Sequence, residues 1–174
     1  LSTYDIINEL IAKVYHKERS IDWISVPVGQ AALNQNLEWL PETSIELLRK
    51  NKIALKGPLA TAVGEGFRSV NVGLRKALDL YACIRPIEWI QGVPSVVKNP
   101  QNIDIVIFRE NTEDVYSGIE FDHDSKEANL LKTFLMKTLN VNTLRFPDSV
   151  SLGIKPISIE GTERLVKSAI DYAL

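Results

Sequence analysis

Residues 56–86 read KGPLATAVGEGFRSVNVGLRKALDLYACIRP, and this stretch decides the fold. A loop rich in glycine, proline, alanine and threonine occupies residues 57–67. A segment with helical spacing follows over residues 69–78, and an apolar, strand-like run begins at residue 80. We therefore expect a loop, a helix and a strand in direct succession.

The sequence upstream alternates between helical and strand-like patterns. The spacing of apolar residues predicts a helix over residues 3–16 and a second helix that begins at Pro41 and Glu42. Strand-like runs occupy residues 21–28 and 52–55. This β-α-β order predicts an α/β architecture.

The sequence downstream continues the alternation. Strands are predicted over residues 80–90, 103–108, 113–121 and 150–157, and helices over residues 125–140 and 161–174. The run 103–108 is apolar enough to be buried on both faces of a sheet. The inward face of helix 125–140 is expected to comprise Leu130, Leu131, Phe134, Leu135 and Leu139.

Composition excludes several classes of protein. The 174 residues are 45% hydrophobic and 24% charged, with a net charge of -2, as in ordinary globular proteins. No run of like charge indicates a nucleic-acid or membrane surface. The single cysteine, Cys83, excludes a disulfide framework and a cysteine-based zinc site, and it is expected to be a buried core thiol.

Polar residues gather around the predicted helix 69–78. Residues 64–69, GEGFRS, approach the glycine fingerprint of dinucleotide binding, but Ser69 replaces the third glycine, which argues against a Rossmann site. Arg68, Asn71 and Arg75 share one helical face. The free backbone N–H groups at the N-terminus of this predicted helix, beside Ser69, favour a bound anion. A capping serine with solvated arginines would explain the same pattern.

Two further arginines end strand-like runs. Arg85 follows residues 80–84 and Arg109 follows residues 103–108, where open α/β sheets place ligand contacts. Because arginine binds carboxylates in a two-pronged geometry, these residues and Arg75 suit a small substrate with several carboxylates. Three unrelated surface arginines would give the same pattern. Tyr116 is a candidate proton donor, although a lone tyrosine more often serves packing.

The stretch 56–86, with VIFRENTEDVYSGIE (residues 106–120) and GIKPISIEGTERLV (residues 153–166), resembles the isocitrate/isopropylmalate dehydrogenase family. Within that family it resembles the bacterial NADP-dependent isocitrate dehydrogenases over essentially the whole chain. Ser69 and Asn71 favour isocitrate, because the isopropylmalate branch carries apolar residues there.

The resemblance implies a role for each matching residue. The implied substrate-binding residues are Ser69, Asn71, Arg75, Arg85 and Arg109. Thr61 and Asn71 would lie near the nicotinamide, and Tyr116 would be the catalytic residue that protonates the enol. The chain departs from the family pattern at Ala60, where relatives often carry a threonine.

The implied fold is a partial isocitrate/isopropylmalate dehydrogenase-like α/β fold, not a Rossmann fold. Residues 1–80 would belong to the large domain, 81–112 to the small domain, 113–155 to a clasp that joins a homodimer, and 156–174 to the small domain again. The implied reaction is oxidative decarboxylation of isocitrate with NADP and Mg²⁺ or Mn²⁺, in the cytoplasm. Metal ligands are not expected within this chain, and NAD stays open as the cofactor. Two further hypotheses stay open for the function: an isopropylmalate, homoisocitrate or tartrate dehydrogenase, and a non-catalytic anion-binding fragment.

We expect the purified 174-residue chain to show no isocitrate-dependent reduction of NADP. The resemblance places the catalytic lysine, the metal-binding aspartates and the adenine-ribose pocket beyond Leu174, and the first strand before Leu1. Apolar surface meant for absent strands should also promote aggregation. Absorbance of the reduced cofactor measures the reaction, and any isocitrate-dependent signal contradicts the expectation.

Overall fold

The computed structural model describes residues 2–59 and 69–174. The chain divides into two compact units, Leu1–Lys56 and Gly57–Leu174. The buried apolar side chains are Ala32 and Ile45 in the first unit and Val70, Leu74 and Ala128 in the second. Within the described ranges, no helix has the length and apolar character that a membrane span requires.

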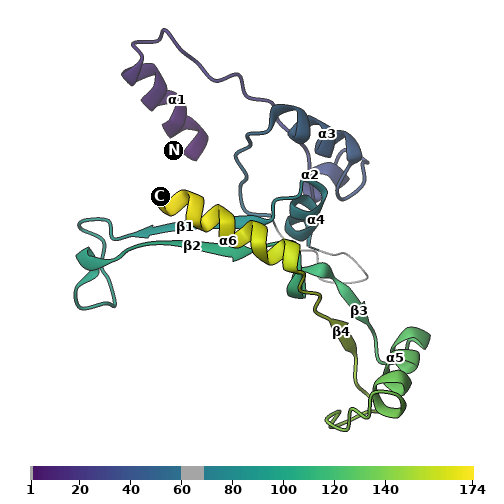
Figure 1. Ribbon diagram of the computed structural model, residues 1–174. Coiled ribbons are helices and arrows are strands. Elements are labelled where there is room, and N and C mark those ends of the chain that lie inside the picture. The colour runs from purple at the N-terminus through teal and green to yellow at the C-terminus, as the bar shows by residue number, and fades with distance from the viewer. Residues whose placement is uncertain (1, 60–68) are drawn as a thin grey trace. The chain divides into compact units, whose positions relative to one another are not determined.

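Three helices form the first unit: α1 (Thr3–Val14), α2 (Gln30–Leu33) and α3 (Glu42–Asn51) (Figure 1). A reciprocal capping box begins α1, because the Ser2 hydroxyl accepts from Asp5 N and the Asp5 carboxylate accepts from Ser2 N. The Trp23 indole N–H donates to Asn8 Oδ1 at 2.9 Å, so the following segment returns along α1. The two predicted helices of this unit are confirmed.

The two strands predicted for the first unit are wrong. Residues 21–28 and 52–55 form no strand in the described structure. A strand needs a neighbour to satisfy its backbone N–H and C=O groups, and residues 21–28 instead contact helices through side chains. The Ser44 hydroxyl donates to the Pro27 carbonyl at 2.7 Å, and the ring centres of Tyr4 and Trp23 lie 5.0 Å apart.

The second unit combines helices with two antiparallel strand pairs. In chain order, its elements are α4 (Val70–Ala77), β1 (Ala82–Glu88), η1 (Pro100–Asn102), β2 (Asp104–Glu110), η2 (Asp114–Ser117), β3 (Ile119–Phe121), α5 (Lys126–Lys137), β4 (Leu152–Ile154) and α6 (Ile159–Ala173). β1 pairs with β2 and β3 with β4. The predicted helices of this unit are confirmed, and so are its strands apart from 113–121. There a 3₁₀ turn and Gly118, with φ of 64°, leave only β3 extended.

Alternate residues of the β1–β2 hairpin point to opposite faces. One face carries Phe108, whose ring packs edge-on against Tyr172 of α6 with ring centres 5.5 Å apart. Figure 1 shows α6 running along the hairpin. The other face carries Cys83, Arg85, Ile107 and Arg109, as the pairing of Cys83 with Arg109 and Arg85 with Ile107 requires.

Two predictions about burial are wrong for the described chain. Ile105 and Ile107 of β2 are 52% and 43% exposed, so this run is not buried on both faces of a sheet. Leu130 and Phe134 of α5 are 63% and 49% exposed, and Ala128 is the buried residue of that helix. The apolar pattern is present, but the described residues provide nothing to cover these faces.

Two carboxylates connect the end of β2 to the start of α6. The Glu110 carboxylate accepts hydrogen bonds from Thr112 N at 2.7 Å, Thr112 Oγ1 at 2.8 Å and Glu113 N at 3.0 Å. The Glu113 carboxylate accepts from Ser158 N at 2.8 Å and Ser158 Oγ at 2.6 Å. Ser158 Oγ in turn accepts from Gly161 N and caps α6. A Cβ at Gly161 would lie 2.8 Å from the Glu113 carboxylate, which explains the glycine.

These hydrogen bonds stabilise the charged carboxylates. Burial opposes ionisation of Glu110, but the donors of Thr112 and Glu113 outweigh it and lower the pKa of Glu110 below 4.5. The side-chain and backbone donors of Ser158 lower the pKa of Glu113 below the same ordinary value. A lowered folded-state pKa contributes stability that is present above the unfolded pKa and is lost as pH falls through the folded pKa.

We predict that the denaturant midpoint of the protein falls as pH is lowered from about 6 to about 3, because Glu110 and Glu113 become protonated. Glu113→Gln and Ser158→Ala should each reduce this acid dependence, since each removes the charge-assisted bond at the start of α6. Urea titrations at a series of pH values measure it. An equal loss in wild type and both variants would show that these bonds do not couple protonation to folding.

Candidate functional site

The hairpin register brings together two of the arginines that the sequence singled out. Cys83 pairs with Arg109 and Arg85 pairs with Ile107, so both arginines lie on the hairpin face opposite α6. Arg85 and Arg109 occupy diagonal positions on adjacent strands, and at this separation long side chains can contact a common ligand. Both residues are exposed in the described chain. Two guanidinium groups on one face provide donors for more than one carboxylate.

Cys83 lies between these arginines and contacts one of them. The Arg85 Nε–H donates to Cys83 Sγ at 3.4 Å. The thiol is half-buried, so the prediction of a buried core cysteine is wrong. Because β1 places Cys83 on the arginine face, its sulfur orients Arg85 rather than filling a core.

Tyr116 lies directly against Arg109. The Arg109 guanidinium carbon is 5.0 Å from the centre of the Tyr116 ring, within the range of a cation–π contact. Tyr116 belongs to η2, which follows β2 after the turn that Glu110 closes. The short turn thus brings the candidate proton donor back against Arg109, near the end of β2.

Helix α4 carries the remaining predicted substrate residues. Ser69 is its N-cap, but its hydroxyl makes no capping hydrogen bond. Asn71 Oδ1 is buried and has no hydrogen-bond partner. Arg75 lies one turn further along, on the same face as Asn71. Val70 and Leu74 are buried and anchor the helix. Two polar side chains at the N-terminal end of α4 therefore have unused hydrogen-bonding capacity.

A lysine that the sequence analysis did not single out connects α4 to the tyrosine segment. Lys76 Nζ donates to the Ser117 carbonyl oxygen at 2.9 Å. This contact places the C-terminal turn of α4, which includes Arg75, beside η2, which includes Tyr116. No periodicity or motif in the sequence marks Lys76, because its partner is a backbone carbonyl 41 residues away.

Two predicted contributors fall outside this description. Thr61 and Arg68 lie outside the described residues. Within residues 2–59 and 69–174, no three histidine, cysteine, aspartate or glutamate side chains gather as metal ligands would. Glu110 and Glu113 instead accept structural hydrogen bonds, and Asp114 pairs with Lys155 at 2.9 Å.

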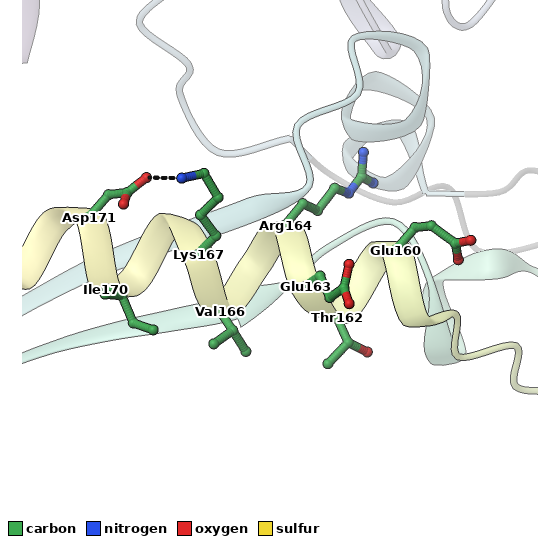
Figure 2. Close-up of a pocket in the computed structure, with 8 residues that line it drawn as sticks. All are labelled: Glu160, Thr162, Glu163, Arg164, Val166, Lys167, Ile170 and Asp171. Carbon is green, nitrogen blue, oxygen red and sulfur yellow. Dashed lines mark ion pairs between the residues drawn. The ribbon is translucent and has the colours of Figure 1, made fainter.

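An open groove of about 760 Å³ lies elsewhere, along α6. Figure 2 shows its lining residues, which all belong to this one helix: Glu160, Thr162, Glu163, Arg164, Val166, Lys167, Ile170 and Asp171. Lys167 and Asp171 form an ion pair within it at 3.3 Å. None of the predicted substrate residues lines the groove. Polar groups from several elements meet at the arginine face, so that face is the better candidate site.

The chain resembles known proteins along nearly its whole length. The family model described as isocitrate/isopropylmalate dehydrogenase matches residues 3–174. The chain is 48% identical over 169 residues to an isocitrate dehydrogenase [NADP] of Staphylococcus epidermidis, a match that covers 97% of this chain and 40% of that protein. It is also 48% identical over 169 residues to the enzyme of the same name from Streptococcus salivarius, with 97% and 43% covered.

A solved structure gives the same result for the fold. The crystal structure of isocitrate dehydrogenase from Methylococcus capsulatus matches with a TM-score of 0.72 and 30% sequence identity, over 98% of this chain and 44% of that one. The predicted fold class, a partial isocitrate/isopropylmalate dehydrogenase-like α/β fold, is confirmed. The chain spans about 40% of the length of the curated relatives it matches. It belongs to the isocitrate/isopropylmalate dehydrogenase family.

Proposed function

We propose that this chain supplies the carboxylate-binding part of an NADP-dependent isocitrate dehydrogenase, which converts isocitrate to 2-oxoglutarate and CO₂. One observation carries the proposal: Arg85 and Arg109 share a hairpin face, and Tyr116 lies under the Arg109 guanidinium. A tricarboxylate needs several fixed cations, and arginine is suited to hold carboxylates bidentately. The relatives from Staphylococcus epidermidis and Streptococcus salivarius are named as NADP-dependent isocitrate dehydrogenases, which supports the same substrate and cofactor.

The proposed substrate contacts divide between the hairpin and α4. Arg85 and Arg109 bind the α- and β-carboxylates, together with Arg75. Ser69 and Asn71 bind the γ-carboxylate arm through the hydroxyl and the side-chain amide. The Ser69 hydroxyl does not cap α4, which supports this role, and Asn71 would donate to the carboxylate through its side-chain NH₂ group.

Tyr116 is the proposed proton donor. Oxidation at C2 of isocitrate and loss of CO₂ from C3 would leave an enol, which Tyr116 would protonate at C3. Arg109 lies against the tyrosine ring, so the guanidinium stacks on the proposed proton donor and orients its ring. The same arginine therefore binds a carboxylate and supports the proton donor.

The cofactors of the proposed reaction are NADP and Mg²⁺ or Mn²⁺. NADP accepts the hydride, and a bound divalent ion would polarise the substrate oxygen. The described residues include no acidic cluster that fits such an ion, so no metal ligand is assigned among them. For the nicotinamide, Asn71 offers a free amide oxygen, and Thr61 is proposed from the resemblance.

We propose the domain boundaries of the family for this chain: large domain over residues 1–80, small domain over 81–112, clasp over 113–155 and small domain over 156–174. Exposed apolar side chains in the proposed clasp, including Leu130 and Phe134, support a homodimer contact there. A cytoplasmic location accords with an enzyme of this type.

A second candidate is a dehydrogenase for another 2-hydroxy acid of the same family, such as isopropylmalate, homoisocitrate or tartrate. Ser69 and Asn71 favour isocitrate over isopropylmalate, because a hydroxyl and an amide suit a carboxylate arm better than an apolar one. A non-catalytic anion-binding fragment would retain the arginine face without turnover.

We predict that the full-length protein reduces NADP with isocitrate and Mg²⁺, that a chelator stops the reaction, and that 3-isopropylmalate is a poor substrate. Arg109→Gln should raise the KM for isocitrate about 10- to 100-fold, as expected for loss of a charged hydrogen bond worth about 1.5–3 kcal/mol. Arg145→Gln, which removes an arginine stacked on Phe146, is the matched control and should leave KM unchanged.

Absorbance of the reduced cofactor, measured with a panel of 2-hydroxy acids as substrates, tests each part of this prediction. Preference for 3-isopropylmalate would assign the second candidate. Absence of reduction by a folded full-length protein, with NAD also tried, would contradict a dehydrogenase function.

A further inference from the structure

Arg164 of α6 contacts three residues from two separate segments of the second unit through one guanidinium group. Its Nη1 donates to both carboxylate oxygens of Asp79, at 3.1 and 3.0 Å. Its Nη2 donates to Thr112 Oγ1 at 3.0 Å. Its guanidinium carbon lies 4.5 Å from the centre of the Tyr81 ring. These partners come from the α4–β1 connection and from the turn after β2.

These two segments connect the elements that carry every described residue of the proposed substrate site. Asp79 and Tyr81 lie between α4, which carries Ser69, Asn71 and Arg75, and β1, which carries Arg85. Thr112 lies between Arg109, at the end of β2, and Tyr116. A guanidinium that holds Asp79, Tyr81 and Thr112 therefore fixes the place where these segments meet.

The connection at Asp79 is tightly folded. Asp79 has φ of 48°, in the left-handed region that a residue with a side chain adopts at some cost. The amide of Leu80 donates back to the Arg75 carbonyl oxygen at 2.8 Å, so the end of α4 folds tightly into β1. The Arg164–Asp79 pair lies at this tight connection, where the chain leaves α4 for β1.

We propose that Arg164 is a positioning residue for substrate binding: it aligns α4 with the β1–β2 hairpin, so that the two groups of carboxylate-binding side chains face one substrate. The inference rests on the proposed function and deepens it. Arg164 acts through Asp79, Tyr81 and Thr112 and does not itself touch the substrate.

The geometry requires arginine rather than lysine. A planar guanidinium donates in a fixed fork and stacks on an aromatic ring at the same time, whereas a lysine ammonium is a compact point charge. The Arg164 side chain is 36% exposed and that of Asp79 is 69% exposed, so solvent screens their attraction. We therefore expect replacement of Arg164 to change mainly the alignment of α4 with the β1–β2 hairpin and to have little effect on the free energy of unfolding.

The test uses Arg164→Gln and Arg164→Lys in the full-length protein, with Lys167→Gln as the control. Lys167 lies one turn further along α6, and its ion partner, Asp171, is on the same helix. We expect both Arg164 variants to raise the KM for isocitrate about 10-fold and to leave the KM for NADP within about two-fold of wild type. The control should change neither. A purely structural role would lower the thermal midpoint and the active fraction without changing KM.

A second set of variants keeps the proposal testable if Arg164 variants fold poorly. Thr112→Val removes one acceptor of the guanidinium, and Asp79→Asn keeps the shape of the carboxylate without its charge. Each should raise the KM for isocitrate, and Thr112→Val combined with Asp79→Asn should deviate from additivity because both act through Arg164. Folded variants with unchanged KM would overturn the inference.

Amide hydrogen exchange separates this inference from the proposed function. Arg164→Gln should speed exchange in residues 79–81 and 110–113, and Lys167→Gln should not. If the wild-type protein reduces no cofactor with isocitrate, the proposed function fails, and unchanged exchange in these segments would then overturn the positioning role as well.

Discussion

The antiparallel register of β1 and β2 is the constraint on which the site depends. Side chains of a strand alternate between faces, so a slip of one residue would move Arg85 or Arg109 to the face that α6 occupies. The observed pairing of Cys83 with Arg109 keeps both guanidinium groups on the other face. The contact of Phe108 with Tyr172 supports this register, because it places the Phe108 face of β2 against α6.

The turn that follows β2 brings Tyr116 to the arginine face that this register forms. The Glu110 carboxylate closes the turn, and the Glu113 carboxylate joins it to the cap of α6. The chain then returns Tyr116 to the Arg109 side chain, while Lys76 holds the neighbouring carbonyl beside α4. These two carboxylates support the arginine face without belonging to it. The Glu110 oxygen accepts hydrogen bonds within the turn, and the Glu113 oxygens accept from Ser158 at the start of α6.

The sequence predicted most elements of the second unit, and it singled out the residues of the proposed site, because helical spacing and strand-end arginines are local signals. It did not predict the partners that lie far along the chain. Ser158 and Glu113 are 45 residues apart, and Arg164 and Asp79 are 85 apart, so no motif marks either pair. The strand predicted over residues 21–28 was wrong because strand propensity is realised only with a pairing neighbour. The Leu130 face of α5 has the expected pattern, but no described residue covers it.

The central claim is that the arginine face of the hairpin binds the substrate carboxylates. A crystal structure of the full-length protein with isocitrate tests it most directly. The account predicts isocitrate carboxylate oxygens within about 2.7–3.2 Å of the guanidinium nitrogens of both Arg85 and Arg109. Isocitrate bound elsewhere, with these two arginines facing solvent or other protein groups, would contradict it.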